Sequence, residues 1–169
     1  MFTQAIKLIS LGSRGLLRHL DENLGDYRPK GDRFDISRSE IQLTDRASGL
    51  SGDACYYGEL WIQKPYRGGC LTAVIPRLMF AIAMLKWSPN LMFGIMEPLA
   101  ACKGLAAREG FMHLEQGGLH WRDRKSSETF EEWLVWTTKD DFIFNMRVSL
   151  DLLSKLYPGK PAEMPVCRS

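Results

Sequence analysis

Cysteine and histidine are sparse in this chain. Its 169 residues include four cysteines, at positions 55, 70, 102 and 167, and three histidines. The cysteines form no Cys-x-x-Cys pair and none is closely spaced with a histidine, so the sequence supports neither a metal site nor a disulfide framework. We therefore expect no metal ion, and reduced thiols in a cytoplasmic protein.

The chain also lacks a strong charge imbalance. Its formal net charge is +2, and its apolar and charged fractions are those of a globular protein. A balance this close to neutral gives no reason to expect nucleic acid as a partner. The length suits one domain over residues 1–169.

Long uninterrupted apolar runs are absent as well. The most apolar segment runs from Leu71 to Trp87 and contains Pro76, Arg77 and Lys86, so it predicts a buried helix and no membrane span. The apolar N-terminal residues are interrupted by Lys7 and precede no small-residue cleavage site, so we expect no signal peptide.

What the chain does contain is a strand, a tight turn and a helix in direct succession. Residues 53–63 predict a strand, the sequence Lys-Pro-Tyr-Arg-Gly-Gly-Cys at 64–70 a turn, and residues 69–85 a helix. The free N–H groups and the positive end of the dipole at a helix N-terminus attract phosphate. Short glycine turns before helices are common, so this pattern alone leaves an ordinary turn as an equal alternative.

The remaining segments predict further alternation of strands and helices. Residues 1–33 predict a short β-α region, with a strand over 5–11 and a helix capped by Ser13. Residues 34–45 predict one or two strands, followed by a hairpin turn at 46–49. Residues 91–97 predict a buried strand, and 99–110 a helix that stops at Gly110.

Beyond Phe111 the sequence predicts antiparallel strands and a last helix. Gly117 and Gly118 predict a hairpin turn between two short strands, and residues 130–137 a further strand. A helix follows from Asp140 or Asp141 to about Pro158, and residues 160–169 form a loosely held tail.

Residues 54–111 resemble the motif core of the GNAT superfamily of acetyl-CoA-dependent N-acetyltransferases. The resemblance rests on Arg67, Gly68 and the order strand, Arg-Gly turn, helix, strand, helix, Gly-Phe. It implies a mixed, twisted central sheet flanked by helices in a single α/β domain. It also implies acetyl-CoA as cofactor and an amine, on a small molecule or a peptide, as acceptor.

The resemblance assigns roles to individual residues. It places the cofactor's pantetheine arm along the backbone at Trp61 and Ile62. The pyrophosphate is expected at the turn and the start of the helix, at Arg67, Gly68, Gly69, Cys70, Leu71 and Thr72. Glu59 is the expected general base, since a two-residue period sets it between the aromatic rings of Tyr57 and Trp61, where burial raises a carboxyl pKa. An ion-paired surface glutamate is the alternative.

Three positions depart from the family pattern. Cys70 stands where the family prefers glycine, and Thr72 where it prefers glycine or alanine. Ala106 stands where many members place the tyrosine that protonates the leaving thiolate. Glu97 and Cys102 lie nearby in the sequence as lesser candidates.

The sequence therefore predicts an N-acetyltransferase and leaves two alternatives open. One is a protein of the same fold that binds CoA or a protein partner without catalysis. The other is a cysteine hydrolase that pairs Cys102 or Cys70 with a histidine. Because the N-terminal region is short for the family, we also expect a possible homodimer that shares the C-terminal strand.

Overall fold

Six strands pair into one mixed sheet. The computed structural model describes the backbone of residues 2–66 and 71–156, and their side chains except those of 59 and 148–156. The sheet order is β1-β3-β4-β6-β5-β2. The strands are β1 (Phe2–Ser10), β2 (Phe34–Ile41), β3 (Asp53–Ile62), β4 (Leu91–Met96), β5 (His113–Asp123) and β6 (Thr129–Thr138). The predicted α/β architecture is confirmed at this level.

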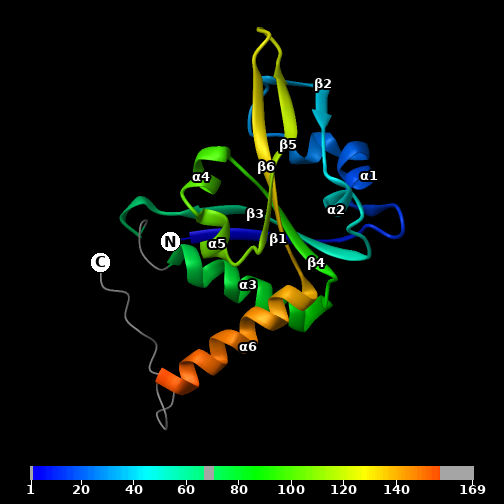
Figure 1. Ribbon diagram of the computed structural model, residues 1–169. Coiled ribbons are helices and arrows are strands. Elements are labelled where there is room, and N and C mark those ends of the chain that lie inside the picture. Colours follow the sequence, from blue (N-terminus) through cyan, green and yellow to red (C-terminus); the bar gives the residue numbers. More distant parts are fainter. Residues whose placement is uncertain (1, 67–70, 157–169) are drawn as a thin grey trace.

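Helices cover both faces of the sheet (Figure 1). They are α1 (Gly15–Glu22), the 3-10 helix η1 (Leu24–Tyr27), α2 (Asp45–Ser48), the 3-10 helix η2 (Lys64–Tyr66), α3 (Leu71–Trp87), α4 (Pro98–Cys102), α5 (Leu105–Glu109) and α6 (Lys139–Leu156). The long helices predicted after the motif turn and after Asp140 are thus present. Pro76 lies inside α3.

Two apolar clusters form the core, one on each face. On one face Leu16 and Leu20, which are four residues apart on α1, pack with Phe93 and Trp121 from the strands. On the other face Phe80 of α3 packs with Tyr57, Met92 and Phe111. Neighbouring residues of one strand, such as Ala54 and Cys55, belong to opposite clusters, as the two-residue period of a strand requires.

Two of the predicted connections near the N-terminus are wrong. Ser13 does not cap α1: the residue before the helix is Arg14, and no side chain caps the helix there. Residues 46–49 do not form a hairpin turn. Instead Thr44 accepts a hydrogen bond from the Ala47 N–H and begins the short helix α2, because β2 crosses to the far edge of the sheet instead of pairing with β3.

The predicted turn at Gly117 and Gly118 is also wrong. Strand β5 continues through both glycines, and its pairing with β6 shifts register between Glu115 and Leu119. Gly117 has a φ of 69°, so the glycine permits an irregularity within the strand and not a reversal. The chain reverses after Asp123, and the distal end of the β5–β6 hairpin projects from the body of the protein (Figure 1).

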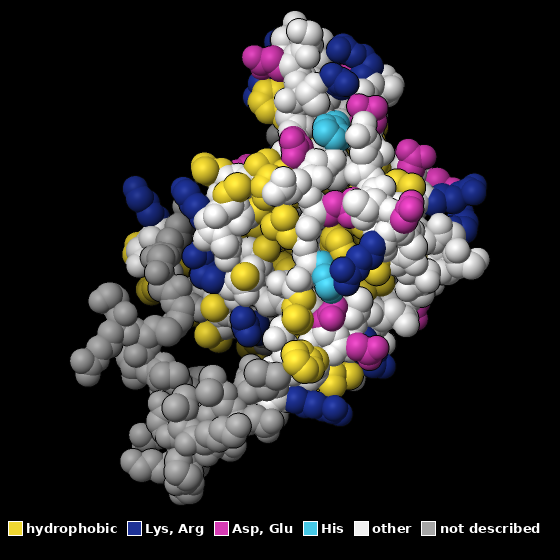
Figure 2. All heavy atoms as spheres, viewed as in Figure 1, with side chains coloured by type: hydrophobic (Ala, Val, Ile, Leu, Met, Phe, Trp, Pro, Cys, Tyr) yellow, Lys and Arg dark blue, Asp and Glu magenta, His cyan; other side chains and the backbone are white. Residues whose placement is uncertain are grey.

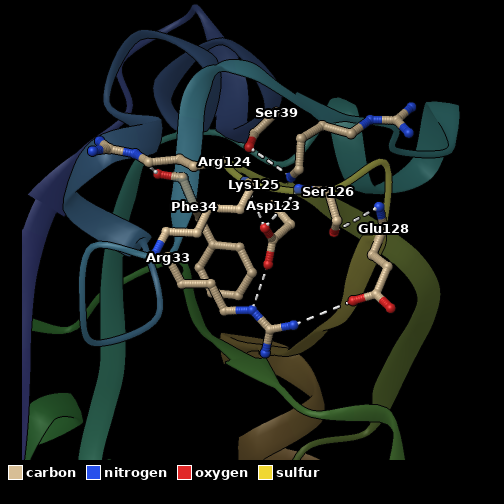
Figure 3. Close-up of polar contacts among 9 residues, drawn as sticks. Arg33, Phe34, Ser39, Asp123, Arg124, Lys125, Ser126 and Glu128 are labelled. Atoms are coloured by element: carbon tan, nitrogen blue, oxygen red, sulfur yellow. Dashed lines mark hydrogen bonds and ion pairs between the residues drawn. The ribbon is translucent and has the colours of Figure 1, made fainter.

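A network of polar contacts fastens this reversal to the start of β2 (Figure 3). Asp123 accepts from the backbone N–H groups of Lys125 and Ser126 at 2.8 and 3.1 Å, which fixes the turn. It also accepts from Arg33 Nε at 2.6 Å. Arg33 Nη2 lies 3.4 Å from Glu128 on the other side of the turn. The hairpin is thereby held against the loop that precedes β2.

The helix predicted over 99–110 is divided into α4 and α5. Gly104 interrupts it with a φ of 74°, and Gly110 ends α5 with a φ of 101°. Arg77 of α3 donates to the carbonyl oxygens of Ala107 and Arg108, both at 3.3 Å, and so binds the last turn of α5. This contact fixes α5 against α3.

Three further expectations concern membrane crossing, the dimer and the C-terminal tail. None of the helices built by residues 2–66 and 71–156 has both the length and the apolar character needed to cross a bilayer. Strand β6 pairs with β4 on one side and β5 on the other, which leaves it no free edge for a dimer partner. The tail, 160–169, lies outside the described residues.

Candidate functional site

The site is built where β3 and β4 separate. These neighbouring parallel strands pair at Ala54 with Leu91, Cys55 with Met92 and Tyr56 with Phe93. Their pairing ends there within the described chain, although β3 continues to Ile62 and β4 to Met96. Each strand keeps its outer neighbour, because β1 pairs with β3 as far as Ile62 and β6 with β4 as far as Met96. The sheet therefore opens into a fork between two well-paired halves.

An irregularity in β3 lies within this fork. The register against β1 shifts between Thr3 and Ala5, which pair with Trp61 and Gly58, so β3 carries one extra residue there. As a result Leu60 and Tyr57, three residues apart, both pack on the same core cluster. The prediction that Trp61 shares the face of Tyr57 is therefore wrong: Tyr57 is buried, whereas 44% of the Trp61 surface is exposed.

A cavity of about 230 Å³ occupies the fork. Its walls come from β3, β4, α4, α5 and β6, and include Tyr57, Leu60, Gly94, Glu97, Leu105 and Glu109. Gly94 keeps the fork open, since a Cβ atom there would lie 3.1 Å from the carbonyl oxygen of Tyr57 and 3.4 Å from the ring of Phe111. The cavity is lined mainly by apolar side chains with few ionisable groups, as is typical of small-molecule sites.

Glu109 is a carboxyl group in the wall of this cavity. It lies on the last turn of α5, and only 3% of its surface is exposed. Burial raises the pKa of Glu109 from its usual 4.5 to about 7, an effect that the nearby Arg108 guanidinium only partly offsets. A carboxyl group with a pKa near neutrality is suited to take up and release protons at physiological pH.

Tyr57 supplies a hydroxyl group to the same cavity. Its ring packs edge-on against Phe80 and Phe111, with centroids 5.4 and 5.8 Å away. The hydroxyl is buried and has no hydrogen-bond partner among the described residues. Burial, and then the charge of Glu109, raise the pKa of Tyr57, so the hydroxyl keeps its proton. A buried unpartnered hydroxyl in a cavity wall is a ready donor to a bound molecule.

The structure describes some of the site residues expected from the sequence and leaves others undescribed. Trp61 and Ile62 lie on the fork strand β3, and Leu71 and Thr72 are the first residues of α3. The expected pyrophosphate residues Arg67, Gly68, Gly69 and Cys70 lie outside the described residues, as does the side chain of Glu59. Ala106, at the position of the family's tyrosine, is buried in the cluster that contains Tyr57.

Within the described chain, the hydrogen bonds of the histidines go to residues other than cysteine. Burial raises the pKa of the Cys55 thiol to about 11, which disfavours a thiolate. Cys102 is exposed at the end of α4. His113 lies 2.8 Å from Asp141 and stacks on Trp136, whereas His19 lies 2.9 Å from Tyr27. Within residues 2–66 and 71–156, no group of three or more potential ligands is arranged to hold a metal ion.

Sequence reasoning missed Tyr57 and Glu109 as site residues. Glu109 follows Leu105 and Ala106 at spacings of four and three, so it occupies the apolar face of its helix, and a carboxylate in that position was an available signal. Tyr57 was noted only as a neighbour of Glu59. The chain matches no protein-family model and no curated protein sequence.

Proposed function

We propose that the protein is an N-acyltransferase that moves an acetyl group from acetyl-CoA to a primary amine. The observation that carries the proposal is the fork between β3 and β4, with a cavity between two parallel strands that begin paired. Two strands that no longer pair with each other, beside an apolar cavity, suit a ligand that combines amide groups with a narrow chain, as pantetheine does.

Four of the expected cofactor residues lie on the fork strand β3 or on the helix that follows it. Trp61 and Ile62 belong to the strand that leaves the pairing, and Leu71 and Thr72 open the 17-residue helix α3 that follows. The N-terminus of a helix of this length carries a positive partial charge that attracts phosphate. In the proposal the pyrophosphate of acetyl-CoA binds at 67–72 and its thioester reaches into the cavity.

The cavity offers groups for both proton transfers of the reaction. In the proposal a carboxylate takes the proton of the acceptor ammonium, and the amine attacks the thioester carbon. The C–S bond then breaks, and the proton that the acylated nitrogen releases passes to the thiolate through the Tyr57 hydroxyl, which gives up one proton and takes another and so remains protonated. Glu109 is a buried carboxyl group of the cavity and Glu59 is the base expected from the sequence, so these two are the candidates for the base. Tyr57 supplies the hydroxyl that Ala106 lacks.

Thiol release tests this proposal. The protein is mixed with acetyl-CoA and a panel of primary amines, and free CoA is measured with a thiol reagent against reactions that lack protein or amine. Amine-dependent release, with acetylated amine confirmed by mass spectrometry, is the expected result. Acetyl-CoA binding without release for any amine would favour a protein that binds CoA without catalysis, the alternative that Ala106 favours.

A further inference from the structure

A second cavity, of about 490 Å³, lies beside the β5–β6 hairpin close to its reversal. It is bounded by the loop before β2, by the beginning of α4 and by the part of the hairpin nearest its turn. Glu97, the residue between β4 and α4, lines both this cavity and the one in the fork. The second cavity therefore adjoins the place where the thioester is proposed to bind. In Figure 2 apolar side chains gather in the area of α4 beneath the projecting hairpin, with acidic side chains at its border.

Aromatic rings form the inner wall of this second cavity. Phe34, Trp121 and Phe130 all line it. The ring of Phe34 lies 5.4 Å from that of Phe130 and 6.2 Å from that of Trp121, measured between centroids. The guanidinium carbon of Arg33 lies 3.8 Å from the centroid of Phe130, so one face of this ring already binds a cation.

The ionisable groups of the cavity leave an excess of negative charge. Glu97, Glu131 and Glu132 line it, and Arg33 is the basic residue among its lining. Arg33 is itself paired with Asp123 and Glu128, neither of which lines the cavity. In the described chain the three glutamates therefore have no ion-pair partner. Glu131 and Glu132 accept hydrogen bonds from Trp133 and Trp121, which are neutral donors.

Electrostatic repulsion among these glutamates acts on Glu132. Burial raises its pKa, the hydrogen bond from Trp121 counteracts this, and the charge of Glu97 raises the pKa again. A bound cation would relieve that repulsion. The described glutamates are not arranged as the ligands of a metal ion. An organic cation, which contacts rings and separate carboxylates together, fits the cavity better.

We infer that the acceptor is a diamine, whose second ammonium group binds in the cavity lined by Phe130, Glu131 and Glu132. This inference rests on the proposed acetyl transfer, and it names the acceptor class for the same site. The reacting amine lies at Glu97, where the two cavities meet, and its methylene chain packs on the aromatic wall. The carboxylates favour a distal ammonium over a distal methyl and disfavour a distal carboxylate.

Three acceptors with four carbon atoms each test the inference: 1,4-diaminobutane, 1-aminobutane and 4-aminobutanoate. Binding is measured by calorimetry at constant ionic strength with CoA present, and kcat/KM by thiol release. Ion pairing and cation–π contact together predict that the diamine binds about tenfold tighter than 1-aminobutane. Its kcat/KM should show a similar preference, and 4-aminobutanoate should be the poorest of the three.

Substitutions test whether the glutamates of the cavity cause the preference for the diamine. Glu132→Gln, which keeps an oxygen for the Trp121 N–H, and Glu131→Gln should each remove most of the preference for the diamine while 1-aminobutane is little affected. Glu40→Gln, which changes an exposed carboxylate outside the cavity that pairs with Arg122 at 3.4 Å, should retain the preference.

Equal binding of diamine and 1-aminobutane, or a preference unchanged in both cavity variants, overturns the inference. Turnover of 1-aminobutane in that case would leave the acetyl transfer standing, whereas absence of turnover with every amine would contradict the acetyl transfer itself.

Discussion

Tyr57 and Glu109 line the same cavity, where the Tyr57 hydroxyl has no hydrogen-bond partner among the described residues. Tyr57 is on β3 and Glu109 is on α5, 52 positions later in the chain. Their charges are coupled, because Glu109 raises the pKa of Tyr57. The fork in the sheet thus brings an acid and a base to one place from two distant segments.

The first prediction concerns stability at Glu109. The native carboxyl holds its proton to about pH 7, whereas the unfolded chain releases it near pH 4.5. Between these values the native state binds more protons, so the free energy of unfolding falls as pH rises. The free energy of unfolding of Glu109→Gln should not fall in this way. Above pH 7 it should exceed that of the wild type by as much as about 3 kcal/mol. Urea unfolding at pH 5 and pH 8 measures it, with the exposed Glu40→Gln as control. Equal pH dependence in wild type and Glu109→Gln would show that the carboxyl is not buried.

The second prediction separates the two candidate bases. If Glu109 takes the amine proton, Glu109→Gln should lower kcat about 100-fold or more and remove the rise of kcat/KM near pH 7. Glu59→Gln should then have a small effect. The opposite pattern would return the role to Glu59. The same assay with Tyr57→Phe should lower kcat at least tenfold if its hydroxyl protonates the thiolate.

The third prediction concerns the width of the fork. Gly94→Val adds a branched side chain 3.1 Å from the Tyr57 carbonyl, and should weaken acetyl-CoA binding by at least tenfold. Calorimetry at a temperature where both proteins are folded gives the affinity. Gly25→Ala is the matched control, since a Cβ there meets nothing within 4 Å. Unchanged affinity in Gly94→Val would place the cofactor elsewhere.

Local patterns predicted most of the fold because they involve neighbouring residues. The period of two in β3 and the apolar character of α3 indicated both elements within two residues of their observed ends. The connections between these elements were harder to predict from local patterns. The glycine pair at 117–118 favours a turn locally, but pairing with β6 keeps β5 extended through it.

The site depended even more on distant contacts. Glu109 is buried because Arg77 and the α3 helix hold α5 against the cavity, and no short-range pattern reports that contact. The irregularity near Glu59 results from pairing with β1 and reverses the faces that alternation predicts for Trp61.

The fourth prediction concerns the hairpin that forms part of the second cavity. The hydrogen bond from Arg33 and those from the turn N–H groups hold the pKa of Asp123 below its usual range. Its contribution to stability is therefore present above the unfolded pKa and lost as pH falls through the folded pKa. Asp123→Asn should lower the melting temperature at pH 7 but not in strong acid. Asp32→Asn, in an exposed pair with Arg28 at 3.6 Å, should change neither. A melting temperature for Asp123→Asn equal to that of the wild type at pH 7 would exclude a stabilising role.

Acetyl-CoA binding tests the central claim most directly. The melting temperature of the full chain is followed by scanning fluorimetry as acetyl-CoA is increased, with ATP at equal concentration as an anionic control. At a hundredfold excess over Kd, mass action adds about 2.7 kcal/mol, which corresponds to a rise of about 5–10 °C for a domain of this size. A rise with acetyl-CoA that ATP does not reproduce is the predicted result. An unchanged melting temperature up to about 1 mM acetyl-CoA, the upper end of ordinary substrate affinities, would contradict the account.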